Sequence, residues 1–191
     1  MEPLTLLYRD DSIAVFNKPS GLLIHRSYID RTETRFALQM ARDQLGQRVY
    51  PVHRLDKPTS GVLLFALSSE AAASLTTAFT AGDVNKKYIA ICRGVTPPEG
   101  VIDYPLLEEQ DRHDLYRQEG KEPQNAVTGY ERLATVELPF AVGRYPTSRY
   151  SLLKVEPLSG RRHQIRRHLK HIFHPLVGDV NYGEGRHNRF F

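Results

Sequence analysis

Short runs of apolar residues, separated by polar residues, Gly and Pro, recur along most of this chain. Runs of this length and spacing are typical of β-strands. We therefore expect strands at residues 12–16, 22–25, 62–67, 86–91, 127–133 and 150–155. Residues 108–125 are polar and lack apolar periodicity, which indicates an exposed loop or hairpin.

Two segments have the spacing of apolar residues that is typical of amphipathic helices. The first covers residues 32–45, and Thr32 is of a type that caps helix N-termini. The second begins after Ser68 or Ser69 and continues to about residue 81. Strands outnumber helices and do not alternate with them strictly. This order favours an α+β fold with a mixed, mainly antiparallel β-sheet flanked by a few helices.

The length of 191 residues suits one domain or two tightly fused halves, and we expect a single domain over residues 1–191. A hydrophobic content of 40% and a charged content of 25% are typical of globular proteins. The single Cys92 excludes an intrachain disulfide, so the cytoplasm is the expected compartment, and its apolar neighbours predict a packed thiol. No apolar run approaches the length of a membrane span, and the N-terminus lacks the pattern of a signal peptide.

Positive charge is concentrated near the C-terminus. Residues 144–191 contain 10 Lys and Arg against 3 Asp and Glu, whereas residues 1–143 contain 16 against 19. A basic segment on an otherwise balanced chain indicates a polyanionic partner. A solvated basic face is the alternative.

Residues 159–172 combine this charge with the period of a helix. Apolar residues such as Ile165 and Leu169 share one face, and basic residues cover the others. Arg161 and Arg162 are expected in the first turn, where a bound anion would offset their unfavourable interaction with the helix dipole. No metal site is expected, because no acidic or Cys ligand is interleaved among the histidines of this region, which are His163, His168, His171 and His174.

A polar loop at residues 53–61 leads directly into an apolar strand, and Pro and Gly punctuate it. Asp56 is therefore held at a rigid position of the kind that often carries function. One alternative is an ordinary surface turn with an ion pair between Arg54 and Asp56. Another is an Asp/His site that uses His53 with Asp56 to hydrolyse a phosphate ester.

Motifs in three regions of the chain point together to one family. They are Asn17-Lys18-Pro19-x-Gly21, His53-Arg54-Leu55-Asp56-x-x-Thr59-Ser60-Gly61, and Gly160-Arg161-x-His163-Gln164-Ile165-Arg166-x-His168, the last followed by His174-Pro175-x-x-Gly178-Asp179. In this order and spacing they resemble the RluA family of pseudouridine synthases, over about residues 8–183. Lys86-Lys87-Tyr88 is similar to the tyrosine segment of that family.

The resemblance implies a pseudouridine synthase-like fold with a central catalytic cleft. It also implies an isomerase that converts uridine to pseudouridine in RNA. The reaction breaks an N-glycosidic bond and rejoins the same base through carbon. Because it needs neither a redox agent nor a group donor, the resemblance implies no cofactor.

The resemblance implies roles for individual residues. Asp56 would be the catalytic aspartate, and it would attack the sugar C1′, attack the base C6 or stabilise the loosened sugar. Arg166 would pair with Asp56 and keep it ionised in a buried site. Tyr88 would stack on the uracil or move a proton, with packing in the core as its alternative. Leu176 would form part of the apolar wall around the base, or part of the core.

Basic residues would hold the RNA. Arg54 would contact phosphate and help to splay the base, and Lys18 would hold a phosphate or order the loop that faces Asp56. Contacts to the RNA backbone are expected from Arg161, Arg162, Arg167 and Lys170. A target base that is paired in a stem must be flipped out of the stack, at a cost of a few kcal/mol.

Three further stretches are similar to family members that modify uridine 65 in the T stem of tRNA, namely His25-Arg26-Ser27-x-x-Asp30-Arg31-x-Glu33, Arg42-Asp43-Gln44-x-Gly46 and Gly143-Arg144-Tyr145-Pro146-Thr147. The expected partner is therefore tRNA, and the alternatives are ribosomal RNA or an RNA-binding module without catalysis. We expect a monomer, because pairing would have to leave a stem-sized groove open. Family members continue past Gly178–Gly183 with a further apolar strand, so this chain is either a fragment or has an unusual end.

Overall fold

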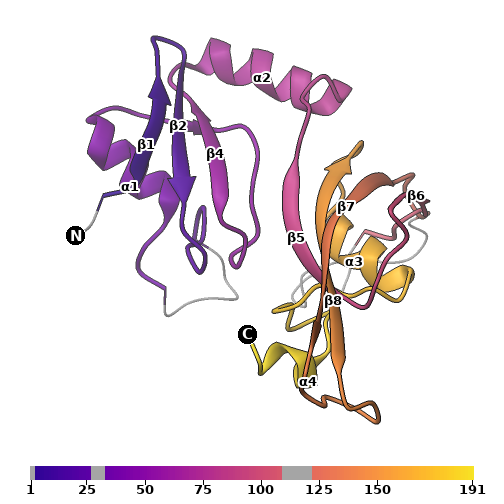
Figure 1. The fold of residues 1–191 in the computed structure, drawn as a ribbon. Coiled ribbons are helices and arrows are strands. Elements are labelled where there is room, and N and C mark those ends of the chain that lie inside the picture. Colours follow the sequence, from indigo (N-terminus) through magenta and orange to yellow (C-terminus); the bar gives the residue numbers. More distant parts are fainter. Residues whose placement is uncertain (1–2, 27–32, 109–121) are drawn as a thin grey trace. The chain divides into compact units, whose positions relative to one another are not determined.

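The computed structural model describes residues 3–26, 33–108 and 122–191. The chain divides into two compact units, Met1–Val84 and Asn85–Phe191 (Figure 1). Each unit contains a four-stranded sheet whose paired strands are antiparallel. The predicted α+β class with mainly antiparallel pairing is therefore confirmed. The single domain over residues 1–191 and its central cleft stay predictions.

The sheet of the first unit has the strand order β1-β2-β4-β3. Its strands are β1 (Thr5–Arg9), β2 (Ile13–Lys18), β3 (Tyr50–Pro51) and β4 (Gly61–Ala66), and its helices are α1 (Ala37–Leu45) and α2 (Ser69–Ala81). Phe16, Leu63 and Phe65 are fully buried in the two central strands. Because successive side chains of a strand point to opposite faces, these residues fix the register of β2 against β4.

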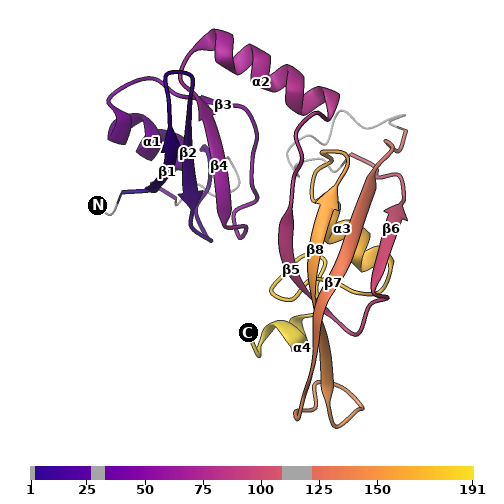
Figure 2. The same cartoon turned by 45° about the horizontal axis from the view of Figure 1, so that its top comes forward.

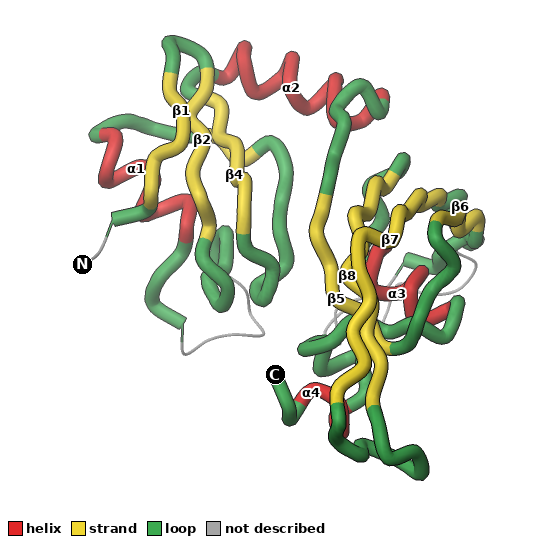
Figure 3. Tube along the Cα trace, in the orientation of Figure 1, coloured by secondary structure: helices red, strands yellow, loops and turns green. Residues whose placement is uncertain are grey.

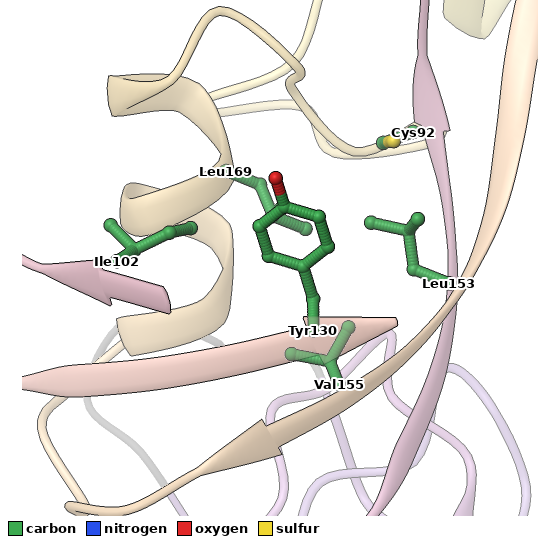
Figure 4. Close-up of a cluster of buried hydrophobic side chains, with 6 residues drawn as sticks. All are labelled: Cys92, Ile102, Tyr130, Leu153, Val155 and Leu169. Carbon is green, nitrogen blue, oxygen red and sulfur yellow. The ribbon is translucent and has the colours of Figure 1, made fainter. Parts of the chain in front are cut away.

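The sheet of the second unit has the order β5-β8-β7-β6. Its strands are β5 (Tyr88–Arg93), β6 (Glu99–Asp103), β7 (Val127–Leu138) and β8 (Ser148–Pro157), and its helices are α3 (Gln164–His171) and α4 (Gly185–Asn188). In Figure 2, α3 lies against one face of this sheet. Leu169 of α3 enters the buried cluster of the unit, together with Cys92, Ile102, Tyr130, Leu153 and Val155 (Figure 4). The apolar face predicted for this helix is therefore confirmed.

The first turns of α1 and α2 are closed in different ways. Ser68 accepts a backbone N–H of α2 through its side chain, as the sequence predicts. Helix α1 begins at Ala37 rather than at residue 32, and its first N–H groups donate to the carbonyls of Leu23 and Ile24. Backbone carbonyls thus satisfy donors that a side-chain cap would otherwise satisfy. Thr32 lies outside the described residues.

The strand expected at residues 22–25 is wrong. Leu23 makes one isolated bridge, with Phe36, and no strand is assigned to this stretch of the described chain. The physical reason is the capping of α1. The carbonyls of Leu23 and Ile24, which a strand would use for pairing, accept hydrogen bonds from N–H groups in the first turn of the helix. The pattern of apolar residues alone cannot distinguish these two uses of the backbone.

The helix expected at residues 159–172 begins only at Gln164. His163 adopts a left-handed conformation with φ of 54°, and Gln164 Oε1 accepts the N–H of Arg161 at 3.0 Å. These contacts form a separate turn before the helix. The prediction that Arg161 and Arg162 lie in the first helical turn is therefore wrong.

Other elements lack a clear signal in the sequence. Every residue of β1 is exposed, so burial does not impose an alternating pattern on it. Strands β7 and β8 extend beyond their predicted bounds into a long hairpin, which Figure 3 shows. Of the loop expected at residues 108–125, residues 109–121 lie outside the described part of the chain. In the part that is described, no helix has the length and apolar character needed to cross a membrane.

Candidate active site

Asp56 lies on a short turn at the entrance to β4. The N–H of Thr59 donates to the carbonyl of Asp56 at 3.0 Å and closes the turn. On one side Leu55 is buried, and on the other Gly61 begins β4 with a φ of +119°, a conformation that favours glycine. The half-buried Asp56 side chain is thus carried by a backbone that is anchored at both ends.

Lys18, at the end of β2, ties this turn to the neighbouring loop. Its side chain is fully buried, and its ammonium donates to the carbonyls of Pro19, Leu22 and Lys57 at 3.0, 2.7 and 3.2 Å. Burial lowers the pKa of Lys18 to about 8, and the charge of Asp56 opposes that shift. Of the two roles predicted for Lys18, this geometry supports ordering of the loop over binding of a phosphate.

Further contacts join the same two loops. The N–H of Gly21 donates to the carbonyl of Lys57 at 2.8 Å, and the hydroxyl of Ser20 donates to the carbonyl of Pro58 at 2.7 Å. The ammonium of Lys57 also pairs with Glu33 at 3.0 Å. The Asn-Lys-Pro-x-Gly motif therefore acts as a support for the Asp56 turn.

His53 has a structural position in the first unit. Its Nε2 accepts the N–H of Leu64 at 2.9 Å, and its ring stacks on Phe79 of α2 with the centroids 5.0 Å apart. The bond from Leu64 occupies the lone pair of Nε2, which a general base would need in order to accept the substrate proton. This geometry disfavours the hydrolase hypothesis, in which His53 acts together with Asp56. Arg54, between them in sequence, is exposed.

In the second unit, Arg166 of α3 forms a bidentate ion pair with Asp179. Its Nε and Nη2 donate to the two carboxylate oxygens at 2.7 and 2.9 Å, and the two side chains are 13% and 4% exposed. Burial raises the pKa of Asp179, but Arg166 and the N–H groups of Tyr182 and Asn181 lower it more, and the net shift is downward. The predicted pair of Arg166 with Asp56 would link the two units and stays a prediction.

Tyr182 lies against the same face of α3. The Cζ atom of Arg166 is 5.0 Å from its ring centroid, and the Nζ atom of Lys170 is 5.7 Å from it. Its hydroxyl is hydrogen-bonded to Nδ1 of His163 at 3.0 Å. The sequence prediction assigns no role to Asp179 or Tyr182. The pattern Gly-Asp-x-x-Tyr-Gly is the signal that marks them.

Tyr88 and Leu176 lie at the edge of the core of the second unit. Tyr88 begins β5 opposite Val155, and Leu176 makes an isolated bridge with Cys92. Both side chains are half-buried and pack against the buried cluster. This placement fits the core alternative for each, and their contacts with uracil stay predictions. Burial raises the pKa of Cys92 to about 11, which agrees with a packed thiol.

The side chains predicted to contact the RNA backbone lie before and along α3, and they are Arg161, Arg162, Arg167 and Lys170. Nε of Arg161 donates to the carbonyl of Asn125 at 3.1 Å, and Nη1 of Arg167 donates to the carbonyl of Leu107 at 2.8 Å. Arg161 and Lys170 are exposed. Their contacts with RNA stay predictions.

The histidines of this region have individual partners. His168 is buried between the hydroxyl of Thr128 and the carbonyl of Tyr104, at 2.9 Å from each, and His174 lies 2.8 Å from the carbonyl of Arg93. Within residues 3–26, 33–108 and 122–191, no three His, Cys, Asp or Glu side chains form a group that could hold a metal ion.

Comparisons with known proteins identify the family. Residues 12–171 match the family described as RNA pseudouridylate synthase. The chain belongs to this family. It is 54% identical over 187 residues to tRNA pseudouridine synthase C of Pasteurella multocida, which covers 97% of this chain and 77% of that relative. It is 50% identical over 189 residues to tRNA pseudouridine synthase C of Vibrio cholerae, with coverage of 98% and 78%.

Two solved human structures have a similar fold over nearly all of this chain. Human RNA Pseudouridylate Synthase Domain Containing 1 is similar with a TM-score of 0.73 and 28% identity, over 97% of this chain and 74% of that one. Human RNA Pseudouridylate Synthase Domain Containing 4 is similar with a TM-score of 0.71 and 28% identity, over 96% and 70%. The chain is therefore an RNA-modifying isomerase by family, and the matched segment includes Asp56, Tyr88 and Arg166.

Proposed function

We propose that this chain isomerises uridine 65 in the T stem of tRNA to pseudouridine. The observation that carries this proposal is an identity of about half, over nearly the whole chain, to relatives named tRNA pseudouridine synthase C. The excess of Lys and Arg in residues 144–191 supports a polyanionic substrate of this kind.

Asp56 is the proposed nucleophile. In the reaction the bond between uracil N1 and ribose C1′ breaks, a bond between C5 and C1′ forms, and C5 loses a proton while N1 gains one. The product is an isomer, so the atoms balance without a cofactor. The Asp56 carboxylate bonds transiently to C1′ or to C6 and is released at the end. The anchored turn supports this role, because a nucleophile acts best when its position is fixed in advance.

The other predicted residues complete the proposal. Arg166 keeps the Asp56 carboxylate ionised, Tyr88 stacks on the target uracil, and Leu176 contributes to the apolar wall around it. Arg54 contacts phosphate and helps to splay the flipped base. The backbone of the RNA is held by Arg161, Arg162, Arg167 and Lys170.

The decisive experiment maps pseudouridine in an unmodified tRNA transcript after incubation with the purified chain. We expect product at one T-stem position. We expect Asp56→Asn to reduce the rate by more than about a thousandfold while tRNA affinity stays within about threefold, because the substitution keeps the shape and removes the nucleophile. Asp11→Asn is the matched control, since the exposed Asp11 lies outside the motifs named above and its replacement should leave the rate unchanged.

The same experiment separates the alternatives. Product in a ribosomal RNA transcript, and none in tRNA, would move the substrate to ribosomal RNA. Binding of tRNA without product would leave an RNA-binding module. We also propose that the chain acts in the cytoplasm as a monomer, and light scattering of the purified chain with and without tRNA measures its oligomeric state.

A further inference from the structure

The segment Gly178–Gly183 is held against the face of α3 that carries Arg166. Arg166 and Lys170 of this face are four residues apart, as neighbours on one side of a helix must be, and His163 lies in the turn directly before the helix. Asp179 and Tyr182 contact the three of them. The segment thus determines where the guanidinium of Arg166 can lie.

Asp179 is the centre of this arrangement. One oxygen, Oδ2, accepts Nε of Arg166, while Oδ1 accepts Nη2 of Arg166 and the N–H groups of Asn181 and Tyr182, at 2.7 to 3.0 Å. One carboxylate therefore holds its own turn and the edge of the guanidinium at once. Asn188 reinforces the turn from α4, because its amide donates to the carbonyl of Asp179 at 2.8 Å.

Tyr182 restricts the tilt of the Arg166 guanidinium, which the ion pair alone does not fix. The bidentate pair fixes the edge of the planar fork, and the ring of Tyr182, 5.0 Å from Cζ of Arg166, limits its tilt. The bond from the Tyr182 hydroxyl to His163 fixes the ring in turn. A guanidinium has five N–H donors, so one such group can bind a carboxylate and a second acceptor together.

We propose that Asp179 and Tyr182 are positioning residues, which fix the Arg166 guanidinium in the orientation that the isomerisation requires. This inference rests on the proposed role of Arg166. A misplacement of about 1 Å in such a group can cost on the order of a hundredfold in rate. Loss of either positioning residue should therefore reduce the rate of the chemical step more than it reduces the affinity for tRNA.

The first test measures kcat, KM and tRNA affinity for Asp179→Asn. The amide keeps an oxygen for the N–H groups of the turn and loses the charge that orients Arg166. We expect kcat to fall by about 10- to 100-fold and the dissociation constant for tRNA to change by less than about threefold. Asn181→Ala is the matched control, because Asn181 contributes its backbone N–H to the same turn and its side chain is exposed.

A double-mutant cycle with Arg166→Met separates positioning from general stability. If Asp179 acts through Arg166, then Asp179→Asn should have little further effect on kcat once Arg166 is methionine. Full additivity of the two changes in kcat would overturn the inference. If Arg166→Met is inactive but Asp179→Asn keeps the full kcat, the proposed function stands and the inference falls. If Arg166→Met keeps full activity, the proposed role of Arg166 falls and the inference falls with it.

Tyr182 provides a second test that decides the matter even if Asp179→Asn does not fold. Tyr182→Phe retains the ring beside the guanidinium and loses the hydroxyl with its bond to His163, so we expect kcat to fall less than in Tyr182→Leu. Tyr182→Leu removes the ring, and we expect kcat to fall by about tenfold or more, with circular dichroism at the assay temperature unchanged. Equal kcat values for the two variants would overturn the role of the ring.

Discussion

At the scale of single residues, this chain buries charged groups where oppositely polarised partners surround them. The ammonium of Lys18 is enclosed by three carbonyls, and the carboxylate of Asp179 is enclosed by a guanidinium and two N–H groups. Both groups hold a loop in place. Taking a charge out of water is costly unless its hydrogen bonds are replaced, so each site tolerates few substitutions.

The ion pair of Asp179 predicts a pH dependence of stability. The folded-state pKa of Asp179 is lower than its value in the unfolded chain, where a free aspartate titrates near about 4. The pair therefore contributes stability that is fully present above that value and is lost as the pH falls below it. Breaking a buried pair costs on the order of 3 kcal/mol, so Asp179→Asn should lower the free energy of unfolding by about that amount at pH 7.

Urea unfolding at pH 7, 4 and 3, followed by circular dichroism, checks this prediction. The difference in unfolding free energy between the unaltered chain and Asp179→Asn should shrink at the two lower pH values. The exposed Asp43→Asn variant is the control and should show no comparable trend. A difference for Asp179→Asn that stays constant from pH 7 to pH 3 would contradict the assignment of the charge.

At the scale of elements, α3 depends on its packing. It has eight residues, which is too short for a helix to be stable alone in water. Leu169 anchors one face in the buried cluster of the second unit, while Tyr182 covers another. The bounds of the helix are set by these contacts and by the turn before it, which is why it begins at Gln164 and not at residue 159.

The turn that holds Asp179 predicts that alanine substitution has different effects at two nearby glycines, Gly183 and Gly185. A Cβ atom at Gly183 would lie 2.3 Å from the carbonyl oxygen of Asp179 and 2.8 Å from that of Leu176, so the backbone must shift. We expect Gly183→Ala to lower the unfolding free energy by about 1–3 kcal/mol and to reduce kcat. A Cβ atom at Gly185 meets nothing within 4 Å, and Gly185→Ala should leave both unchanged.

Thermal or urea unfolding and steady-state kinetics on the two alanine variants check this pair of expectations. Because the substitutions are chemically identical and two residues apart, a difference between them reports the close backbone approach at Gly183. Indistinguishable variants would show that the turn can relax without moving Asp179.

At the scale of the whole molecule, the distribution of charge predicts how RNA binding responds to salt. Residues 144–191 have a net charge of +7 and residues 1–143 a net charge of −3, and Arg161 and Lys170 expose their side chains within the basic segment. Neutralisation of phosphates releases counterions, so the affinity for tRNA should fall steeply as salt rises. Replacing either residue by Gln should weaken binding and reduce the slope of log affinity against log salt by roughly one.

Filter binding of tRNA between about 50 and 200 mM salt measures that slope. Lys154→Gln is the control, because the ammonium of Lys154 pairs with Glu131 and Glu156 within the second unit. It should leave the slope unchanged. An affinity that is flat across this range would contradict electrostatic binding through the basic segment 144–191.

Much of the fold was accessible from the sequence, and the reasons are local. The strands at β2, β4, β5, β7 and β8 and the helix α2 follow from apolar runs and a Ser cap. Prediction failed at Leu23, where the carbonyl closes a helix that follows it, and at Arg161, where a side-chain amide twists the chain into a turn. In both cases the deciding contact involves a partner that a hydrophobic pattern does not specify.

The sequence by itself determined the family, the α+β class and the motif residues, because a few chemically specific side chains recur in a fixed order. It marked Asp56, Arg166 and Lys18 but did not say which atoms they contact. Only the tertiary structure decided that the ammonium of Lys18 donates hydrogen bonds to three carbonyls. It also decided that Arg166 pairs with Asp179, thirteen residues further along the chain. The physical reason is that hydrogen bonds are satisfied by whatever the folded chain brings within about 3 Å, and that proximity is a property of packing.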